Sequence, residues 1–268
     1  MKITVPAIAK LKAEGRKITM VTAYDFPTAA IADAAGIDII LVGDSVGNVV
    51  LGYPSTIPVT MDETIHHTRA AARGRKNALL VADLPFLSYQ VSLEEAIRNS
   101  GRCLKEAEAE AVKLEGGERV ARTIEAISNA DIPVMAHIGL TPQSVHALGG
   151  YRVQGRGDES RRRLLADAQA VEAAGAFSVV LEAIPGELAR EITETIHIPT
   201  IGIGAGPHCS GQVLVFHDLV GLSERKVPSF VKKYADLYGA GVKAVQQFVS
   251  EVQSGKFPDE AHTYKSEK

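Results

Sequence analysis

The segment Asp38-Ile-Ile-Leu-Val-Gly-Asp44 decides the fold class of this chain. Between its two aspartates it is almost entirely apolar. A strand that alternates apolar and polar residues has one face in water, whereas a continuous apolar run is typical of a strand covered by protein on both faces. We therefore interpret this segment as a buried strand of a parallel sheet.

Similar short apolar runs recur along the rest of the chain, and helical segments separate most of them. The other runs are Ile18–Ala23, Ala78–Ala82, Ala111–Leu114, Pro133–Ala136, Ser178–Leu181, Pro199–Ile203 and Gln212–Phe216. Eight strands that alternate with helices predict a (β/α)8 TIM barrel, since eight is the number that closes such a sheet. An open, doubly wound sheet is the main alternative, and the last run could also be read as a helix.

The helices are marked by apolar spacing and by their starts. Thr60 and Glu63 have the spacing of a capping box, which satisfies free backbone donors at a helix start. Apolar residues at helical spacing predict further helices at Arg161–Ala174 and Phe230–Val252. An amphipathic helix over Ala7–Glu14 is expected to precede the barrel.

No linker divides the chain, so we expect a single catalytic domain over residues 1–268. The longest irregular stretches, Val46–Pro58 and Thr141–Asp158, both follow strands. Barrel enzymes carry their chemistry on the loops after the strands, at the C-terminal mouth.

The composition excludes several classes of protein. The net charge is −3 and the longest basic cluster is Arg161-Arg162-Arg163, which argues against a nucleic-acid partner. No segment has the roughly 20 apolar residues that a membrane span needs, and the N-terminus lacks a signal-peptide pattern. With only two cysteines, Cys103 and Cys209, we expect reduced thiols and a cytoplasmic location.

Charged residues follow six of the apolar runs. They are Asp25, Asp44, Asp83, Glu115, His137 and Glu182. Strand ends of a parallel barrel meet at one mouth, so five carboxylates and an imidazole are expected to converge there. Like charges repel strongly in a cavity of low dielectric constant, so either protons or a cation must offset them, and a cation fits better at neutral pH.

Oxygen ligands without cysteine suit Mg²⁺, which keeps water or substrate in several of its coordination positions. Asp44, Asp83 and Glu115 come from three consecutive strands and are the best-placed metal ligands. Asp25 is expected to orient a loop or an outer water.

Further side chains belong to the same mouth. Lys113 lies two residues before Glu115, so both point to the same face of their strand, where Lys113 is either a structural counter-charge or a partner for an anionic substrate. Ser45 offers a hydroxyl to the same substrate. The apolar neighbours of Glu182 predict a raised pKa and a role as general base. His137 is equally compatible with metal binding, substrate binding and a structural role.

These groups suit proton abstraction next to a carbonyl, with Mg²⁺ chelating a 2-keto acid and stabilising its enolate. The residues do not identify the electrophile that the enolate would attack.

Several long motifs resemble the ketopantoate hydroxymethyltransferase family, over residues 18–255. They are Val42-Gly-Asp-Ser-Val-Gly47, Thr56-Ile-Pro-Val-Thr60, Ala82-Asp-Leu-Pro-Phe86, Val112-Lys-Leu-Glu-Gly-Gly117, His137-Ile-Gly-Leu-Thr-Pro-Gln-Ser144, Gly149-Gly-Tyr-Arg-Val-Gln-Gly-Arg156, Leu181-Glu-Ala-Ile-Pro185 and Gly202-Ile-Gly-Ala-Gly206. The resemblance implies transfer of a hydroxymethyl group from methylenetetrahydrofolate to 3-methyl-2-oxobutanoate in pantothenate and coenzyme A biosynthesis.

The same resemblance implies site roles and an assembly. Asp44, Asp83 and Glu115 match the metal site; Ser45, Asp83 and Lys113 match substrate contacts; Glu182 matches the proton acceptor. The implied assembly is a homodecamer. One departure is Glu108, which stands where the family usually has a glycine and puts the geometry of that turn in doubt.

Two other functions remain as alternatives. A Mg²⁺-dependent lyase or mutase of the phosphoenolpyruvate mutase/isocitrate lyase type would use similar chemistry, but such enzymes usually carry a reactive cysteine in a mouth loop. A non-catalytic phosphate-binding module built on Gly202–Gly206 would leave the ring of carboxylates unexplained.

Overall fold

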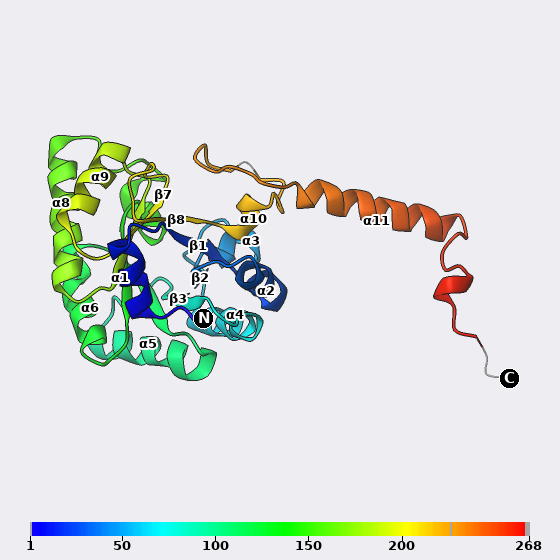
Figure 1. Cartoon of the computed structure of the whole chain (residues 1–268), viewed down its shortest axis with the longest axis horizontal. Helices are drawn as coiled ribbons and strands as arrows, with labels where there is room; N and C mark the ends of the chain where they lie inside the picture. The colour runs from blue at the N-terminus through cyan, green and yellow to red at the C-terminus, as the bar shows by residue number, and fades with distance from the viewer. Residues whose placement is uncertain (1, 226, 266–268) are drawn as a thin grey trace. The chain divides into compact units, whose positions relative to one another are not determined.

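A computed structural model describes residues 2–225 and 227–265, and in it eight parallel strands close into a barrel (Figure 1). Each strand pairs with the next along the chain, and β8 pairs with β1 to complete the ring. The strands are β1 (Ile18–Thr22), β2 (Ile39–Val42), β3 (Leu79–Asp83), β4 (Ala111–Glu115), β5 (Val134–Gly139), β6 (Ser178–Glu182), β7 (Thr200–Ile203) and β8 (Gly211–Leu214). The predicted TIM barrel is confirmed, including its eighth strand.

Helices follow most of the strands and lie outside them (Figure 1). The α-helices are α1 (Val5–Ala13), α2 (Phe26–Ala34), α3 (Val46–Val49), α4 (Met61–Gly74), α5 (Leu93–Ala107), α6 (Ala121–Ser128), α7 (Val145–Leu148), α8 (Asp158–Ala173), α9 (Gly186–Thr195), α10 (Phe216–Leu219) and α11 (Leu237–Gln253). Short 3-10 helices cover η1 (Glu118–Val120), η2 (Pro142–Ser144) and η3 (Glu260–His262). The capping box of Thr60 and Glu63 is present at the start of α4.

The apolar core has two layers. One cluster contains residues from all eight strands together with Ile8 and Leu11 of α1, and it fills the inside of the barrel. The other contains alternate positions of β3, β4, β5 and β6 and the inner faces of α5, α6, α8 and α9. The predicted N-terminal helix is therefore confirmed, and its apolar side chains extend the core inside the barrel.

The chain divides into two compact units, Met1–Phe216 and His217–Lys268. The first contains the whole barrel. The second contains α11, which begins at Leu237 rather than at Phe230 as the apolar spacing predicted. The cause is local: Asp236 accepts a hydrogen bond from the backbone N–H of Gly239 at 3.0 Å and so caps the helix there. The single domain expected over residues 1–268, of which positions 1, 226 and 266–268 lie outside the described residues, stays a prediction.

No helix within residues 2–225 and 227–265 combines the length and the apolar composition that crossing a bilayer requires.

Candidate active site at the carboxyl ends of the strands

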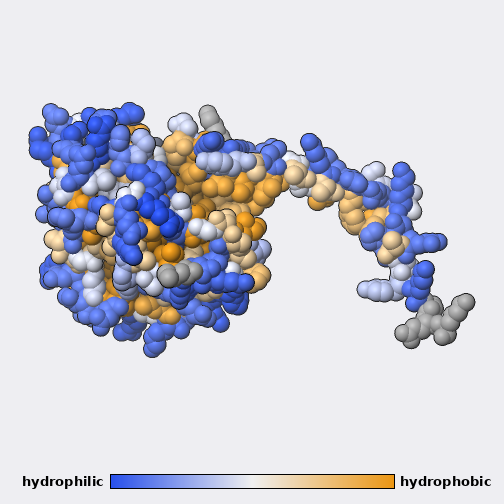
Figure 2. Space-filling model, viewed as in Figure 1, coloured by the Kyte–Doolittle hydropathy of each residue, from blue (hydrophilic) through white to orange (hydrophobic). Residues whose placement is uncertain are grey.

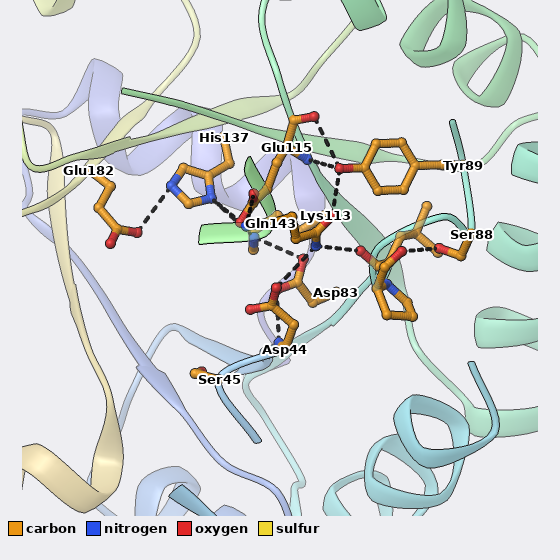
Figure 3. Close-up of polar contacts among 12 residues, drawn as sticks. Asp44, Ser45, Asp83, Ser88, Tyr89, Lys113, Glu115, His137, Gln143 and Glu182 are labelled. Carbon is orange, nitrogen blue, oxygen red and sulfur yellow. Dashed lines mark hydrogen bonds and ion pairs between the residues drawn. The ribbon is translucent and has the colours of Figure 1, made fainter. Parts of the chain in front are cut away.

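Charged side chains occupy lumen-facing positions near the carboxyl ends of four neighbouring strands. They are Asp83 on β3, Lys113 and Glu115 on β4, His137 on β5 and Glu182 on β6. The residues that precede them on the same faces belong to the cluster inside the barrel: Val81, Ala111, Met135 and Val180. Because side chains alternate along a strand, each charged group points into the same lumen. The strand-end residues predicted from sequence are therefore brought together (Figure 3), Asp25 excepted.

Lys113 is the cation at the centre of the group. Its Nζ lies 2.8 Å from Oδ1 of Asp83, and the register of β3 and β4 places the two residues opposite each other. Burial lowers the pKa of Lys113, but the carboxylates of Asp83, Glu115 and Asp44 outweigh it and hold that pKa above its usual value. Lys113 is therefore charged at neutral pH.

Asp83 also holds the loop after β2 in place through a hydrogen bond. Its Oδ2 accepts a hydrogen bond from the backbone N–H of Asp44 at 3.0 Å. Burial raises the pKa of Asp83 to about 6. The Lys113 cation opposes this rise, and the Asp44 carboxylate adds to it. Burial and the Glu115 carboxylate likewise raise the pKa of Asp44. The site gathers four carboxylates, those of Asp44, Asp83, Glu115 and Glu182, around the side chains of Lys113 and His137.

His137 lies between two carboxylates, as Figure 3 shows. Its Nδ1 is 3.4 Å from Oε1 of Glu115, and its Nε2 is 3.1 Å from Oε2 of Glu182. Burial and the Lys113 cation lower the pKa of His137, but the two carboxylates raise it to about 9. Lys113 Nζ is also 3.3 Å from Nδ1, a contact that could be a hydrogen bond only with a neutral ring. We favour the imidazolium, because a carboxylate oxygen faces each ring nitrogen.

Glu182 differs from the other carboxylates in its exposure. Its side chain is 18% exposed, whereas those of Asp83 and Glu115 are 2% and 1% exposed. A polar partner, His137, faces it at 3.1 Å in addition to the apolar neighbours that the sequence indicated. Of these three acids, Glu182 is the most exposed to a bound molecule.

Two polar residues of the site were missed by reasoning from strand ends. Gln143 lies in η2, after β5, and Tyr89 lies in the loop after β3; both are buried. The Gln143 side chain donates to Oδ2 of Asp44 at 3.0 Å and accepts from the Tyr89 hydroxyl at 2.8 Å. Gln143 lies inside the family-like segment His137–Ser144, and this was the sequence feature that could have identified it. It was missed because it lies four residues beyond the end of β5, whereas the prediction considered only residues at strand ends.

The other two predicted residues have different surroundings. Ser45 is half-buried beside the site, and its Oγ is 2.8 Å from the hydroxyl oxygen of Tyr24. Asp25 is not part of the group: its Oδ1 accepts from the backbone N–H of Thr28 at 2.8 Å and caps α2. The structure therefore gives Asp25 a helix-capping contact in place of the expected orientation of a loop or an outer water.

The donor atoms suit a hard divalent cation. Oδ1 of Asp83 and Oε1 of Glu115 are buried and accept no hydrogen bond of good geometry, although each faces a cationic nitrogen. Within residues 2–225 and 227–265, no three Asp, Glu, His or Cys side chains already surround one point as a metal site would. Mg²⁺ commonly takes only one or two carboxylates, with water and substrate completing its shell, and these two oxygens fit that pattern.

Neither cysteine offers a reactive thiol. Cys103 is buried on α5, where burial raises its pKa to about 12, and Cys209 is buried between β7 and β8, where burial also raises its pKa. The thiolate is the reactive form of cysteine, so both side chains are inert at neutral pH.

Solved structures share the fold at low sequence identity. Phosphonopyruvate hydrolase in complex with oxalate and Mg²⁺ matches with a TM-score of 0.63 and 16% identity, covering 98% of this chain and 92% of that chain. A 2,3-dimethylmalate lyase of the phosphoenolpyruvate mutase/isocitrate lyase superfamily matches with a TM-score of 0.60 and 17% identity, covering 98% and 93%. At these identities the likeness shows the fold alone.

Sequence relatives are far closer. A family model described as ketopantoate hydroxymethyltransferase matches residues 2–260. Relatives named 3-methyl-2-oxobutanoate hydroxymethyltransferase are 59% identical over 263 residues in Geobacter metallireducens and 58% identical over 264 residues in Moorella thermoacetica. Each match covers 98% of this chain and 98% of the relative. The chain therefore belongs to the ketopantoate hydroxymethyltransferase family and is an enzyme of that family.

Proposed function

We propose that the chain transfers a hydroxymethyl group from methylenetetrahydrofolate to 3-methyl-2-oxobutanoate and so supplies 2-dehydropantoate for pantothenate and coenzyme A biosynthesis. The observation that carries the proposal is the convergence of buried carboxylates, Lys113 and His137 at one barrel mouth, in a chain of this family. Such a site can bind a small anionic keto acid together with a cation.

In this proposal Asp44, Asp83 and Glu115 hold Mg²⁺. The gathering of carboxylates, and the two buried carboxylate oxygens that accept no hydrogen bond of good geometry, support that assignment. When bound, Mg²⁺ would act as a Lewis acid toward the keto and carboxylate oxygens of the substrate and stabilise the enolate.

The chain's own residues bind and orient the keto acid. Lys113 supplies a buried positive charge, which attracts the substrate carboxylate and keeps Asp83 in place through their ion pair. Ser45 supplies a hydroxyl at the edge of the site, while Asp44, Asp83 and His137 line the rest of the substrate pocket.

Glu182 is the proposed base. A base must touch the carbon from which it takes a proton, and Glu182 is more exposed than Asp83 or Glu115. His137 holds one oxygen of Glu182 through Nε2 and leaves the other for the proton.

In the transfer, the C3–H bond of the keto acid breaks and its proton passes to Glu182. The one-carbon unit of methylenetetrahydrofolate loses both of its C–N bonds and gains a bond to C3 and a bond to the oxygen of a water molecule. The proton held by Glu182 and one proton of that water go to the two folate nitrogens, and tetrahydrofolate leaves.

The test is loss of the C3 proton of 3-methyl-2-oxobutanoate in D₂O, followed by NMR with enzyme and Mg²⁺. We expect exchange without the folate donor, and Glu182→Ala should abolish it while leaving Mg²⁺ binding and folding intact. Glu187→Ala is the matched control, because Glu187 is exposed on α9 and contacts Arg190 at 2.9 Å. Unchanged exchange in Glu182→Ala would mean that another residue is the base.

The same experiment, repeated with the folate donor present, tests the lyase or mutase alternative. An enzyme of that type would cleave or rearrange its own substrate without folate, usually with help from a cysteine at the mouth. The buried thiols of Cys103 and Cys209 do not support that chemistry. Folate-dependent formation of 2-dehydropantoate would separate the two functions.

We also propose that the enzyme assembles into homodecamers. Support comes from α11, on which no residue is buried and whose apolar side chains are exposed (Figure 2). These side chains are Leu237, Tyr238, Val242, Val245, Phe248, Val249 and Val252. A monomeric mass in solution would contradict this proposal.

A further inference from the structure

We infer that Tyr89 and Gln143 form one positioning unit that sets the separation and orientation of Asp44 and Glu115. The two residues come from different loops, after β3 and after β5, and both are buried, at 2% and 4% exposure. The inference rests on the proposed cation site, because it concerns two of the carboxylates assigned to it.

Gln143 contacts both carboxylates at once. Its backbone N–H donates to Oε2 of Glu115 at 3.0 Å, and its side-chain Nε2 donates to Oδ2 of Asp44 at 3.0 Å. Nε2 also donates to the backbone carbonyl of Leu84 at 3.0 Å. Both amide N–H bonds are therefore used, and one glutamine connects two acids that lie on separate segments of the barrel mouth.

Tyr89 determines which way the Gln143 amide points. Its hydroxyl oxygen accepts from the backbone N–H of Glu115 at 3.1 Å. The hydroxyl has one proton and two acceptors in reach, Oε1 of Gln143 at 2.8 Å and the carbonyl oxygen of Glu115 at 3.1 Å, and Oε1 of Gln143 is the closer one. A flipped amide would place Oε1 against the Asp44 carboxylate and the Leu84 carbonyl, which are both acceptors. The hydrogen-bond pattern thus permits one orientation, and removing the tyrosine hydroxyl removes part of that selection.

This arrangement controls which carboxylate oxygens remain for a cation. Gln143 occupies Oδ2 of Asp44 and Oε2 of Glu115 and so leaves the second oxygen of each acid to other partners. In Glu115 that second oxygen, Oε1, is buried and accepts no hydrogen bond of good geometry.

Strand pairing alone would not position Asp44. Asp44 lies beyond the end of β2 at Val42, so no ladder hydrogen bond of that strand holds it. Its backbone N–H is held by Asp83, but its side chain is held by Gln143, a residue 99 positions away in sequence. Gln143 is therefore a positioning residue for Asp44, and Tyr89 acts through Gln143.

The experiment measures Mn²⁺ binding to the metal-free enzyme, from the EPR signal of free Mn²⁺, for the wild type, Tyr89→Phe, Gln143→Met and the double variant. Groups that orient metal ligands typically change affinity by roughly 10- to 100-fold, and we expect losses in this range for both single variants. If the two residues act as one unit, the double variant should bind about as weakly as Gln143→Met alone.

A purely structural role is excluded by a second readout. Tyr89→Phe should require a higher Mg²⁺ concentration than the wild type for half-maximal C3 exchange. At saturating Mg²⁺ its exchange rate should be close to that of the wild type. Tyr53→Phe and Gln154→Met make the same chemical changes elsewhere, where the side chains contact Glu63 and the backbone of Arg152, and should leave Mn²⁺ affinity unchanged.

Each outcome has a distinct meaning. This inference would be overturned if Tyr89→Phe folds and binds Mn²⁺ as tightly as the wild type. It would also be overturned if the losses of Mn²⁺ affinity in the two single variants add up in the double variant. Either result would leave the proposed function standing. Absence of saturable Mn²⁺ binding in the wild type would overturn the cation site itself. If Gln143→Met fails to fold, Tyr89→Phe with its affinity and exchange readouts decides the question alone.

Discussion

Replacing Glu108 with glycine should stabilise the protein. Glu108 follows the last residue of α5 and has φ 58° and ψ 25°, in the left-handed region that glycine adopts without strain. Its side chain is exposed and takes part in no hydrogen bond or ion pair with the described residues. The carbonyl of Glu108 accepts from Arg75 at 3.1 Å, and glycine keeps that contact because it is made by the backbone.

The expected gain follows from two opposing terms. The left-handed conformation raises the free energy of a residue with a Cβ atom by roughly 1–2 kcal/mol. Glycine loses more backbone freedom on folding, which costs roughly 0.5–1 kcal/mol. The free energy of unfolding should therefore rise by about 0.5–1 kcal/mol in Glu108→Gly, which for a chain of this size corresponds to a Tm increase of roughly 1–3 °C.

Urea denaturation and thermal unfolding measure the change, with Glu108→Ala as the control. Alanine removes the same charge but keeps the Cβ atom and hence the strain, so its unfolding free energy should stay within about 0.5 kcal/mol of the wild type. Equal stabilisation by glycine and alanine would refute the backbone argument and point to charge instead. A destabilised Glu108→Gly would refute it as well.

Three further changes probe the site and one helix start. Gly139→Ala should lower stability by about 2 kcal/mol or more and reduce C3 exchange, because φ is +96° and the new Cβ would lie 2.3 Å from the carbonyl oxygen of Glu182; wild-type exchange would contradict this. Lys113→Met should lower the unfolding free energy of the metal-free enzyme by about 3–5 kcal/mol, since it leaves buried carboxylates unpaired, and Mg²⁺ should restore part of the loss in urea titrations. Tyr53→Phe should lower stability at pH 7 only slightly, because the half-buried hydrogen bond with Glu63 is screened by solvent. The Tyr53 hydroxyl is the main cause of the lowered pKa of Glu63; this stabilisation therefore exists above the unfolded pKa of about 4.3 and should vanish as pH falls through the lower folded value.

The sequence by itself determined the barrel and much of its mouth. Eight apolar runs are local features, and their continuity predicts parallel strands without knowledge of any contact. Period-two alternation placed Lys113 and Glu115 on one face, and the strand ends identified Asp83, His137 and Glu182 as neighbours. These predictions succeeded because strand periodicity and the common direction of parallel strands act over a few residues at a time.

Only the tertiary structure decided how those groups are paired. Lys113 faces Asp83 because of the register between β3 and β4, and His137 meets Glu182 across β5 and β6. Gln143 reaches Asp44 across 99 positions of sequence. Periodicity can assign a side chain to a face, but the distance between two side chains depends on strand register and on loop paths, which arise only when the barrel closes.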